Sequence, residues 1–527
     1  DVEITDPGAT EAVITTNATN NFGYAGIFVE ADNVTISGLE IGANTPWDNK
    51  TIEVIGDAFT FRNSFMNVAA GGSLYFGDWR FDAGTDTSYM LSYEIDNNIF
   101  SDGTSVDITS GAGYSGATAD KKITNNQFEF SQAMYTASGN SSWPYISFTG
   151  DSTTVPWFTY PMTGATISGN TFNNTAPNGI HIRARGIADD STFDWESYWN
   201  DNTFNKAVIV GPNLFSDVRT YSTTCSGSYI CNDVRQIGAV IQPEIDHAVN
   251  GDTVLVSAGT FPEAVTVNKS LTITGAGPTT TIIDPPSGNG LSIRASDITI
   301  EDLQITGAAH GANLAGTILN ITFDNVQFLN NVSRGIEMQT ATTDLITNVQ
   351  VLNSLFDNNN LGIRMASGTR VDGITIDNTT FRNHVGSGFN QSNDGGVGWV
   401  KNLTVTNSTF TNNGTVSGYA GVYAEEFSNV LIEDSTFTGN WYGINLWDGY
   451  NVAASTTTNV VVRNNTFTDH KMSTIALSAR TSDPNAQLFL VENNTINQNV
   501  GALAGATSAH LAVTTSSANP NGAVDVV

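Results

Sequence analysis

One short phrase recurs along the chain and limits its possible folds more than any other feature. Three copies are VTNSTFTNN at 405–413, IEDSTFTGN at 432–440 and VRNNTFTDH at 462–470. The phrase is an aliphatic residue, a variable residue, Asn or Asp, two further residues, and then Phe or Ile. Its closing apolar residue returns every 23 to 30 residues, at Ile305, Phe328, Phe356, Phe381, Phe410, Phe437, Phe467 and Ile496. A period of this length indicates stacked supersecondary units that bury their apolar faces on one another.

Each copy of the phrase alternates apolar and polar residues and is rich in β-branched side chains, which is typical of strands. Gly, Asn and Asp separate the copies, and no long helical run lies between them, which disfavours βαβ units and leucine-rich horseshoes. We therefore predict coils of two or three short strands that climb by the strand spacing of about 4.8 Å. Phe should stack inside, and the Asn of the phrase should bond its equivalents above and below at a bend.

The repeated aliphatic-x-Asn-x-x-Phe pattern resembles the pectin-lyase-like superfamily of right-handed parallel β-helix proteins. The resemblance covers most of the chain and implies the fold. It does not imply one function, because the superfamily contains lyases, hydrolases, phage spikes, adhesins and inert surface proteins.

The order of the phrases predicts an all-β chain of two tandem right-handed parallel β-helices. Residues 1–210 form the first, 211–236 form a connector, and 237–527 form the second. The second opens with a capping helix, since Ile241, Ile245 and Val249 have helical spacing and Asn250-Gly251 is a C-terminal stop. The chain begins with a segment like the one that follows this cap, so the first β-helix is expected to lack its N-terminal cap.

Charge and cysteines predict an extracellular or cell-surface protein. The chain has 51 acidic and 20 basic residues and a net charge of −31, which disfavours nucleic acid and anionic lipid as partners. No apolar run is long enough to insert in a membrane. The chain shows no signal peptide and begins without Met, as expected of a mature product or a fragment. Cys225 and Cys231 are expected to form a disulfide, in preference to a metal pair, because no His lies nearby.

No constellation of residues predicts catalysis, a metal site or a cofactor. The six His are scattered, and we see no Lys or Arg that recurs beside an acidic cluster in adjacent coils. Asn/Asp turns leave weak surface calcium binding open. The best enzymatic alternative is a groove with Trp195 and Trp199 as sugar platforms. Its charged residues would be Asp189, Asp190, Asp194 and Glu196, opposite Arg183 and Arg185. A solvated acidic loop is the favoured interpretation of that segment.

Two further sets of residues are candidates for contact with sugars. Trp441 and Trp447 could stack sugar rings, although filling of the core and turns together with a contact surface is the favoured interpretation. Asn-x-Ser/Thr sequons suggest glycosylation, although a chain so rich in Asn and Thr also produces them by chance. The candidate acceptors are Asn17, Asn140, Asn390, Asn402 and Asn413.

These observations favour an extracellular structural protein that assembles head to tail with copies of itself into a filament or surface layer. Added strands at the junction would come from Val2 and Ile4 or from Val524 and Val526. The alternative is a carbohydrate-active enzyme, a lyase or hydrolase, or a polysaccharide-binding spike or adhesin. A third interpretation is that the chain is a piece of a longer adhesin.

Overall fold

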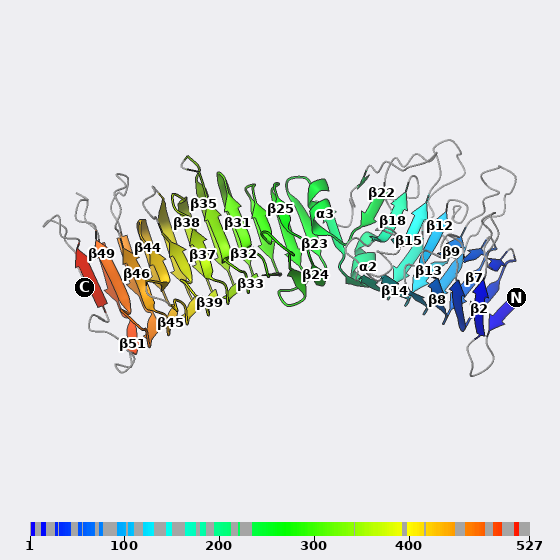
Figure 1. Ribbon diagram of the computed structural model, residues 1–527. Coiled ribbons are helices and arrows are strands. Elements are labelled where there is room, and N and C mark those ends of the chain that lie inside the picture. Colours follow the sequence, from blue (N-terminus) through cyan, green and yellow to red (C-terminus); the bar gives the residue numbers. More distant parts are fainter. Residues whose placement is uncertain are drawn as a thin grey trace. The chain divides into compact units, whose positions relative to one another are not determined.

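The computed structural model (Figure 1) resolves the chain into two compact units, Asp1–Ala248 with Val254–Gly259, and Val249–Thr253 with Thr260–Val527. The residues that it describes are 2–5, 12–16, 27–29, 31–43, 51–54, 56–68, 73–76, 92–101, 104–109, 120–130, 144–149, 164–174, 180–185, 194–211, 220–221, 234–341, 343–392, 398–415, 418–447, 459–479, 488–497 and 511–515.

The strands of the first unit up to β18 are distributed in turn over three sheets, so that each sheet takes every third strand of the chain. Sheet A is β1 (Val2–Thr5), β4 (Val34–Ser37), β7 (Phe59–Arg62), β10 (Tyr93–Asp96), β13 (Lys121–Thr124) and β16 (Ala165–Ser168). Sheet B is β2 (Ala12–Thr16), β5 (Leu39–Ala43), β8 (Phe65–Val68), β11 (Ile99–Ser101), β14 (Gln127–Phe130), β17 (Thr171–Asn174) and β19 (Thr203–Asn205). Sheet C is β3 (Ile27–Val29), β6 (Ile52–Val54), β9 (Ser73–Phe76), β12 (Ser105–Thr109), β15 (Pro144–Thr149), β18 (Ile180–Arg185), β22 (Val234–Ile237) and β21 (Thr220–Tyr221).

The second unit repeats this arrangement, and the chain enters it through β23 (Asp252–Val256) and β24 (Gly259–Phe261). Sheet D continues from β23 with β26 (Leu271–Gly275), β29 (Ile298–Glu301), β32 (Ile318–Asp324), β35 (Ile346–Leu352), β38 (Arg370–Asp377), β41 (Trp399–Thr406), β44 (Phe427–Glu433), β47 (Asn459–Arg463) and β50 (Leu488–Glu492). Sheet E continues from β24 with β27 (Thr281–Ile283), β30 (Gln304–Thr306), β33 (Gln327–Leu329), β36 (Leu355–Asp357), β39 (Thr380–Arg382), β42 (Thr409–Thr411), β45 (Thr436–Thr438), β48 (Thr466–Thr468) and β51 (Thr495–Asn497). Sheet F is β25 (Val265–Val267), β28 (Leu291–Ile293), β31 (His310–Ala315), β34 (Arg334–Gln339), β37 (Leu361–Met365), β40 (Phe389–Gln391), β43 (Ala420–Ala424), β46 (Tyr442–Trp447), β49 (Ile475–Ala479) and β52 (Leu511–Thr515).

The predicted internal stack of phenylalanines is confirmed. In the second unit, the rings of successive coils lie nearly parallel with centroids 4.6 to 4.9 Å apart. The members of this stack are Phe328, Phe356, Phe381, Phe410, Phe437 and Phe467, all of them fully buried. A shorter stack of Phe100, Phe128, Phe172 and Phe204 runs through the first unit. The Phe of the repeated phrase therefore fixes the register of the coils.

A column of glycines lies against the phenylalanine stack at the start of the sheet F strands. A Cβ atom at Gly388 would lie 2.7 Å from the Phe410 ring and 2.9 Å from the Gly421 carbonyl oxygen. The same holds in neighbouring coils, where Gly335 faces Phe356 and Gly362 faces Phe381. These glycines are required by close packing, because any side chain would overlap a buried ring.

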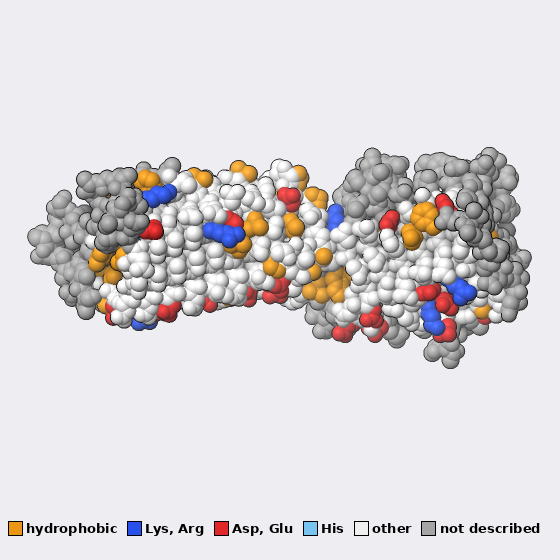
Figure 2. All heavy atoms as spheres, turned by 90° about the horizontal axis from the view of Figure 1, so that it is seen from below, with side chains coloured by type: hydrophobic (Ala, Val, Ile, Leu, Met, Phe, Trp, Pro, Cys, Tyr) orange, Lys and Arg blue, Asp and Glu red, His pale blue; other side chains and the backbone are white. Residues whose placement is uncertain are grey.

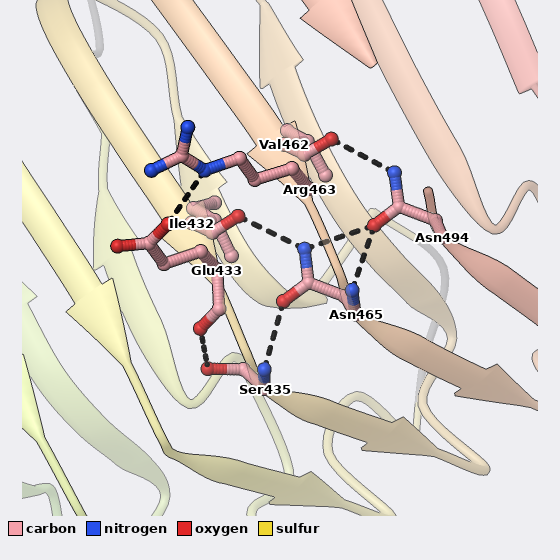
Figure 3. A network of polar contacts seen from close by, with 7 residues as sticks. All are labelled: Ile432, Glu433, Ser435, Val462, Arg463, Asn465 and Asn494. Atoms are coloured by element: carbon pink, nitrogen blue, oxygen red, sulfur yellow. Dashed lines mark hydrogen bonds and ion pairs between the residues drawn. The ribbon is translucent and has the colours of Figure 1, made fainter. Parts of the chain in front are cut away.

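The bend between sheets D and E is held by two kinds of side-chain ladder. Asn407 lies in the left-handed region (φ 51°) and donates its amide to Asp377 Oδ1 in the preceding coil, at 2.8 Å. Figure 3 shows the inner ladder, in which Asn465 donates to the Ile432 carbonyl and accepts from the Ser435 backbone N–H. Asn494 repeats this role one coil further on. Asn378 of the phrase donates to its equivalent Asn353 at 2.8 Å, as predicted, whereas Asn407 bonds Asp377, the residue before its equivalent Asn378.

The segments expected between the two β-helices have defined neighbours in the first unit. β22 lies antiparallel to β18, and β21 lies antiparallel to β22. The predicted helix forms as α3 (Ile241–His247), belongs to the first unit and packs against β20 (Val208–Gly211). Cys225 and Cys231 lie outside the described residues. The division at residues 210 and 236 and the disulfide stay predictions.

Candidate anion-binding face

The outward face of sheet F presents one continuous row of polar side chains. Alternate residues of its strands point into the core, so the residues between them point outward. The strand register joins these outward residues coil by coil. We call them the sheet F row, and in order they are Ser292, Asn313, Glu337, Arg364, Asn390, Tyr423 and Asn445.

A charged cluster occupies the middle of the row. Arg364 Nη1 donates a hydrogen bond to Glu337 Oε1 at 3.1 Å. Arg334 Nε lies 3.1 Å from the other carboxylate oxygen, Oε2, as an ion pair. His310 is paired in register with Arg334 on the adjacent strand. Arg294 follows β28 and donates to both the carbonyl oxygen and the side-chain oxygen of Asn313, at 2.9 Å each. One carboxylate is therefore paired with two guanidinium groups, and His310 and Arg294 lie on the neighbouring coils.

Several buried polar atoms in this cluster have no hydrogen-bond partner among the described residues. They are His310 Nδ1, Arg334 Nε and Glu337 Oε2. The contact between Arg334 and Glu337 is short enough for an ion pair, but its angles do not make a hydrogen bond. Buried polar groups in native proteins are nearly always bonded, so three such atoms side by side indicate a place where a polar molecule completes the bonding.

Burial shifts the pKa values of the ionisable groups in this cluster. It raises the pKa of Glu337 above its usual value, and the two arginines offset that effect only in part. Burial, with Arg334 and Arg364 beside it, lowers the pKa of His310, so the imidazole is neutral near pH 7. Burial also lowers the pKa of Arg334. The cluster is thus poorly solvated and short of acceptors for its donors.

The distribution of charge sets sheet F apart from its neighbours. Glu337 is the only acidic residue in the ten described strands of the sheet. Sheets D and E instead carry acidic residues at Glu301, Asp324, Asp357, Asp372, Asp377, Glu433 and Glu492. Figure 2 shows one face of the second unit, where most side chains are uncharged and acidic ones follow one edge. In a chain with a net charge of −31, an outward sheet face with one balanced carboxylate is favourable for an anion.

Aromatic residues lie at the far end of the row. Tyr423 donates its phenolic hydroxyl to Glu425 Oε1 at 2.7 Å. Trp447 ends β46 two residues after Asn445, so it points to the same side, and it is 42% exposed. Trp441 immediately precedes β46, and Lys471 Nζ lies 5.8 Å from its ring centroid. Of the two tryptophans predicted to stack sugars in this half, Trp447 is the one that the sheet F row presents.

The enzymatic groove predicted around residues 183–199 is not formed as expected. The segment folds into α2 (Trp195–Asn200), with Asp194 as its N-cap and Glu196 exposed. Trp195 is 2% exposed and belongs to the core, so its prediction as a sugar platform is wrong. Trp199 is half-buried and stacks on Phe204 with centroids 5.2 Å apart. Arg183 and Arg185 belong to β18, and Asp189 and Asp190 lie outside the described residues.

The candidate glycosylation sites differ in how deeply their side chains are buried. Asn390 is 5% exposed in the sheet F row, and Asn413 is fully buried with its amide donating to the Phe381 carbonyl. An oligosaccharide fits neither position in the folded chain, so those two predictions are wrong. Asn402 is exposed and donates to Asp372, and its glycosylation stays a prediction. Asn17 and Asn140 lie outside the described residues, as do the strand residues Val524 and Val526.

The search of the sequence for a basic residue beside an acidic cluster in adjacent coils did not find this group, because its arginines flank a single acidic residue. Arg334 and Glu337 share one strand, and Arg364 lies opposite Glu337 on the next. A sequence signal for this row does exist. Each member follows a glycine and one apolar residue, as in Gly335-Ile336-Glu337 and Gly362-Ile363-Arg364. Aligning the coils on that glycine, instead of on the Phe, brings the whole row into register.

An open groove of about 670 Å³ lies in the first unit, along the bend between sheets A and B. The side chains of Asn63, Asn97 and Asn125 line it, with Ile99 beside them. Their amides bond along the bend, as when Asn97 Nδ2 donates to Asn63 Oδ1 at 2.8 Å. We assign this groove to the turn ladder of the fold.

Among the described residues, no three His, Cys, Asp or Glu side chains are grouped so that they could hold a metal ion. The part of the chain that the structure describes contains no helix long and apolar enough to cross a membrane.

Comparison with known proteins agrees with this architecture. A family model described as a right handed beta helix region matches residues 375–519. No curated protein sequence matches the chain. Among solved structures it is similar to ORF18 of Geobacillus virus E2, with 12% identity, a TM-score of 0.29, and coverage of 49% of this chain and 55% of that one. The chain thus spans about half the length of the viral protein.

Two further solved structures are similar. One is tailspike protein gp49 of Pseudomonas phage LKA1, with 12% identity, a TM-score of 0.29, and coverage of 80% of this chain and 72% of that one. The other is the mannuronan C-5 epimerase AlgE4 A-module of Azotobacter vinelandii, with 16% identity, a TM-score of 0.28, and coverage of 52% and 91%. The chain is a right-handed parallel β-helix protein. The predicted all-β fold class of parallel coils is confirmed, and the resemblance to the pectin-lyase-like superfamily stays a prediction. That the two units are separate β-helices stays a prediction.

Proposed function

We propose that this β-helix protein binds a carboxylated polysaccharide along the outward face of sheet F. The observation that carries the proposal is the Arg334–Glu337–Arg364 cluster, with its unsatisfied buried atoms, on a sheet that is otherwise free of acidic side chains. Guanidinium groups bind carboxylates through paired, charge-assisted hydrogen bonds, which are the strongest polar contacts that such a face can offer.

The rest of the row suits the uncharged parts of a sugar chain. Asn445 offers an amide donor and acceptor for hydroxyl groups, and Tyr423 offers a phenol. The aromatic face of Trp447 can stack on a sugar ring. Because the row crosses the strands, its members follow one another at about 4.8 Å, and a linear ligand lying along it meets all of them. A secreted or cell-surface location is part of this proposal, since polysaccharides of this kind occur outside cells.

Replacing Arg364 with Ala should weaken binding of polygalacturonate about tenfold, because one charge-assisted hydrogen bond to a ligand carboxylate is lost. Arg463→Ala is the matched control, since Arg463 also pairs with a glutamate, Glu433, at the bend between sheets D and E. Calorimetry with the wild type and both variants measures the effect. Equal weakening by both substitutions would count against a site on sheet F.

The chemical class of the ligand is tested with parallel probes. Dextran should not bind measurably, because it lacks charge, and dextran sulfate tests whether any polyanion suffices. Tighter binding of polygalacturonate than of dextran sulfate supports carboxylate recognition. The same incubations decide whether the protein is an enzyme, because a lyase releases unsaturated products and a hydrolase shortens the chains.

Self-assembly is a second candidate, favoured by the edges of the sheets. Among the described residues, β1 pairs on one side only, with β4, and β52 pairs on one side only, with β49. Strand edges of this kind can add a strand from another copy, and Val2 and Ile4 lie in β1. Electron microscopy and sedimentation over a range of protein concentrations should show head-to-tail polymers. A single monomeric species at every concentration would contradict this candidate.

A further inference from the structure

We propose that Glu337 is an internal competitor for the arginine site, and that its protonation opens the site to an external carboxylate. This inference rests on the proposed function of sheet F and adds a mode of regulation to it. In the structure the Glu337 carboxylate stands where a carboxylate of the ligand would bind, between Arg334 and Arg364. The site therefore holds a built-in anion of the same chemical type as its ligand.

The geometry shows why this internal anion is replaceable. Glu337 receives one hydrogen bond, from Arg364, while its Oε2 is buried with only the ion-pair approach of Arg334. A carboxylate on a flexible ligand is free to align with both guanidinium groups, whereas Glu337 is tied to the strand that also carries Arg334. The internal pair is thus weaker than the bidentate contacts that an external carboxylate could make.

The electrostatic surroundings make the competition depend on pH. The ionisable groups of the described residues that belong to the cluster or act on it come from five strands or their flanks, and they are Arg294, His310, Arg334, Arg364 and Tyr419. None of them carries a carboxyl group. Burial raises the pKa of Glu337, so this carboxyl takes up a proton at a higher pH than ordinary glutamates do.

The direction of the effect follows from the two protonation states. Above the raised pKa, the ionised Glu337 offsets one arginine and repels a second carboxylate. Below it, the carboxyl is neutral and both arginines face the ligand without a counter-ion. Uronic acids keep their charge to a lower pH, since an unperturbed carboxyl has a pKa of about 4. Affinity for a polyuronate should therefore rise as pH falls from neutral and decline only when the ligand itself is protonated.

His310 gains a positive charge in the same direction, so the wild-type pH profile alone does not separate the two groups. Glu337→Gln separates them, because the amide keeps the size of the side chain and removes its charge at every pH. His310 is unchanged in that variant. Glu433→Gln is the matched control, since Glu433 pairs with Arg463 at a bend away from sheet F.

The experiment measures polygalacturonate binding by calorimetry for the wild type, Glu337→Gln and Glu433→Gln between about pH 7 and about pH 5. We expect Glu337→Gln to bind about tenfold more tightly than the wild type near pH 7, through loss of the competing charge. Most of the wild-type gain on acidification should be absent from this variant. Its affinity should also fall more steeply with added salt, because more arginine charge is free to meet the ligand.

The outcomes distinguish this inference from the proposed function. If the wild type binds through Arg364 but Glu337→Gln binds no more tightly, the inference is wrong and the site stands. If neither protein binds polygalacturonate at any pH, both are wrong. Circular dichroism and thermal melting establish that Glu337→Gln is folded. If it is not, a wild-type affinity that stays flat or falls between about pH 7 and about pH 5 overturns the inference.

Discussion

Replacing Phe410 with Ala should lower the free energy of unfolding of the second unit by about 3–5 kcal/mol, the usual cost of emptying a buried Phe site. Phe410 is fully buried, and its ring stacks on Phe381 and Phe437 with centroids 4.8 and 4.9 Å away. The glycine column also packs on this ring, at Gly388. The cavity would lie between rigid coils that cannot collapse to fill it.

Urea denaturation followed by tryptophan fluorescence measures the loss, and hydrogen exchange locates it in the strands next to β42. Phe410→Leu is the control, since it keeps most of the buried volume and should cost less than half as much. Similar costs for the two variants would show that stacking of the rings, and not filled volume, sets the stability of the coil.

Replacing Asn359 with Ala should cost about 4 kcal/mol, because two buried backbone groups lose their partners at a cost of about 1–3 kcal/mol each and the side chain's own bonds are lost as well. Asn359 Oδ1 accepts from the Asn331 backbone N–H at 2.9 Å, and its Nδ2 donates to the Phe328 carbonyl at 2.8 Å. The ladder continues through His384, whose Nδ1 accepts from the Asn359 backbone N–H. Water does not reach this bend to take over the bonds, since Asn359 is 2% exposed.

The next residue in the chain supplies the matched control. Asn360 is exposed, and its substitution by Ala should change the free energy of unfolding by less than about 0.5 kcal/mol. The two variants differ by one position in sequence and have the same composition. Equal stability of Asn359→Ala and Asn360→Ala in urea denaturation would refute the assignment of the inner ladder as a structural element.

Features that repeat in the sequence could be predicted, because each one is fixed by its neighbours in the coil. The recurring Phe of the phrase predicted the internal stack of rings. Asn407 predicted the bend, since Asn tolerates the left-handed conformation better than most residues do. The sheet F row could not be found from the same anchor. Glu337 follows Phe328 by nine residues, but Arg364 follows Phe356 by eight, so a fixed offset places them in different rows.

Departures from the repeat were harder to interpret. The acidic composition of the segment around Trp195 favours a solvated loop. In the structure Asp194 caps a short helix, and this helix turns Trp195 and Tyr198 into the core. An insertion in a solenoid can fold over the core and cover apolar residues, or it can project into solvent. The composition of the insertion does not distinguish these two outcomes. Trp195 and Tyr198 are three residues apart, so they lie on the same face of the helix and are buried together.

The parallel ladders of sheets D, E and F have a mechanical consequence for the second unit. Their hydrogen bonds point from coil to coil, so tension applied along the stack loads the few bonds at one junction and detaches one coil at a time. Tension applied along a strand instead loads all bonds of that strand together. A protein built in this way should yield gradually when stretched end to end and resist strongly when sheared, which a force-extension measurement with two attachment geometries can show.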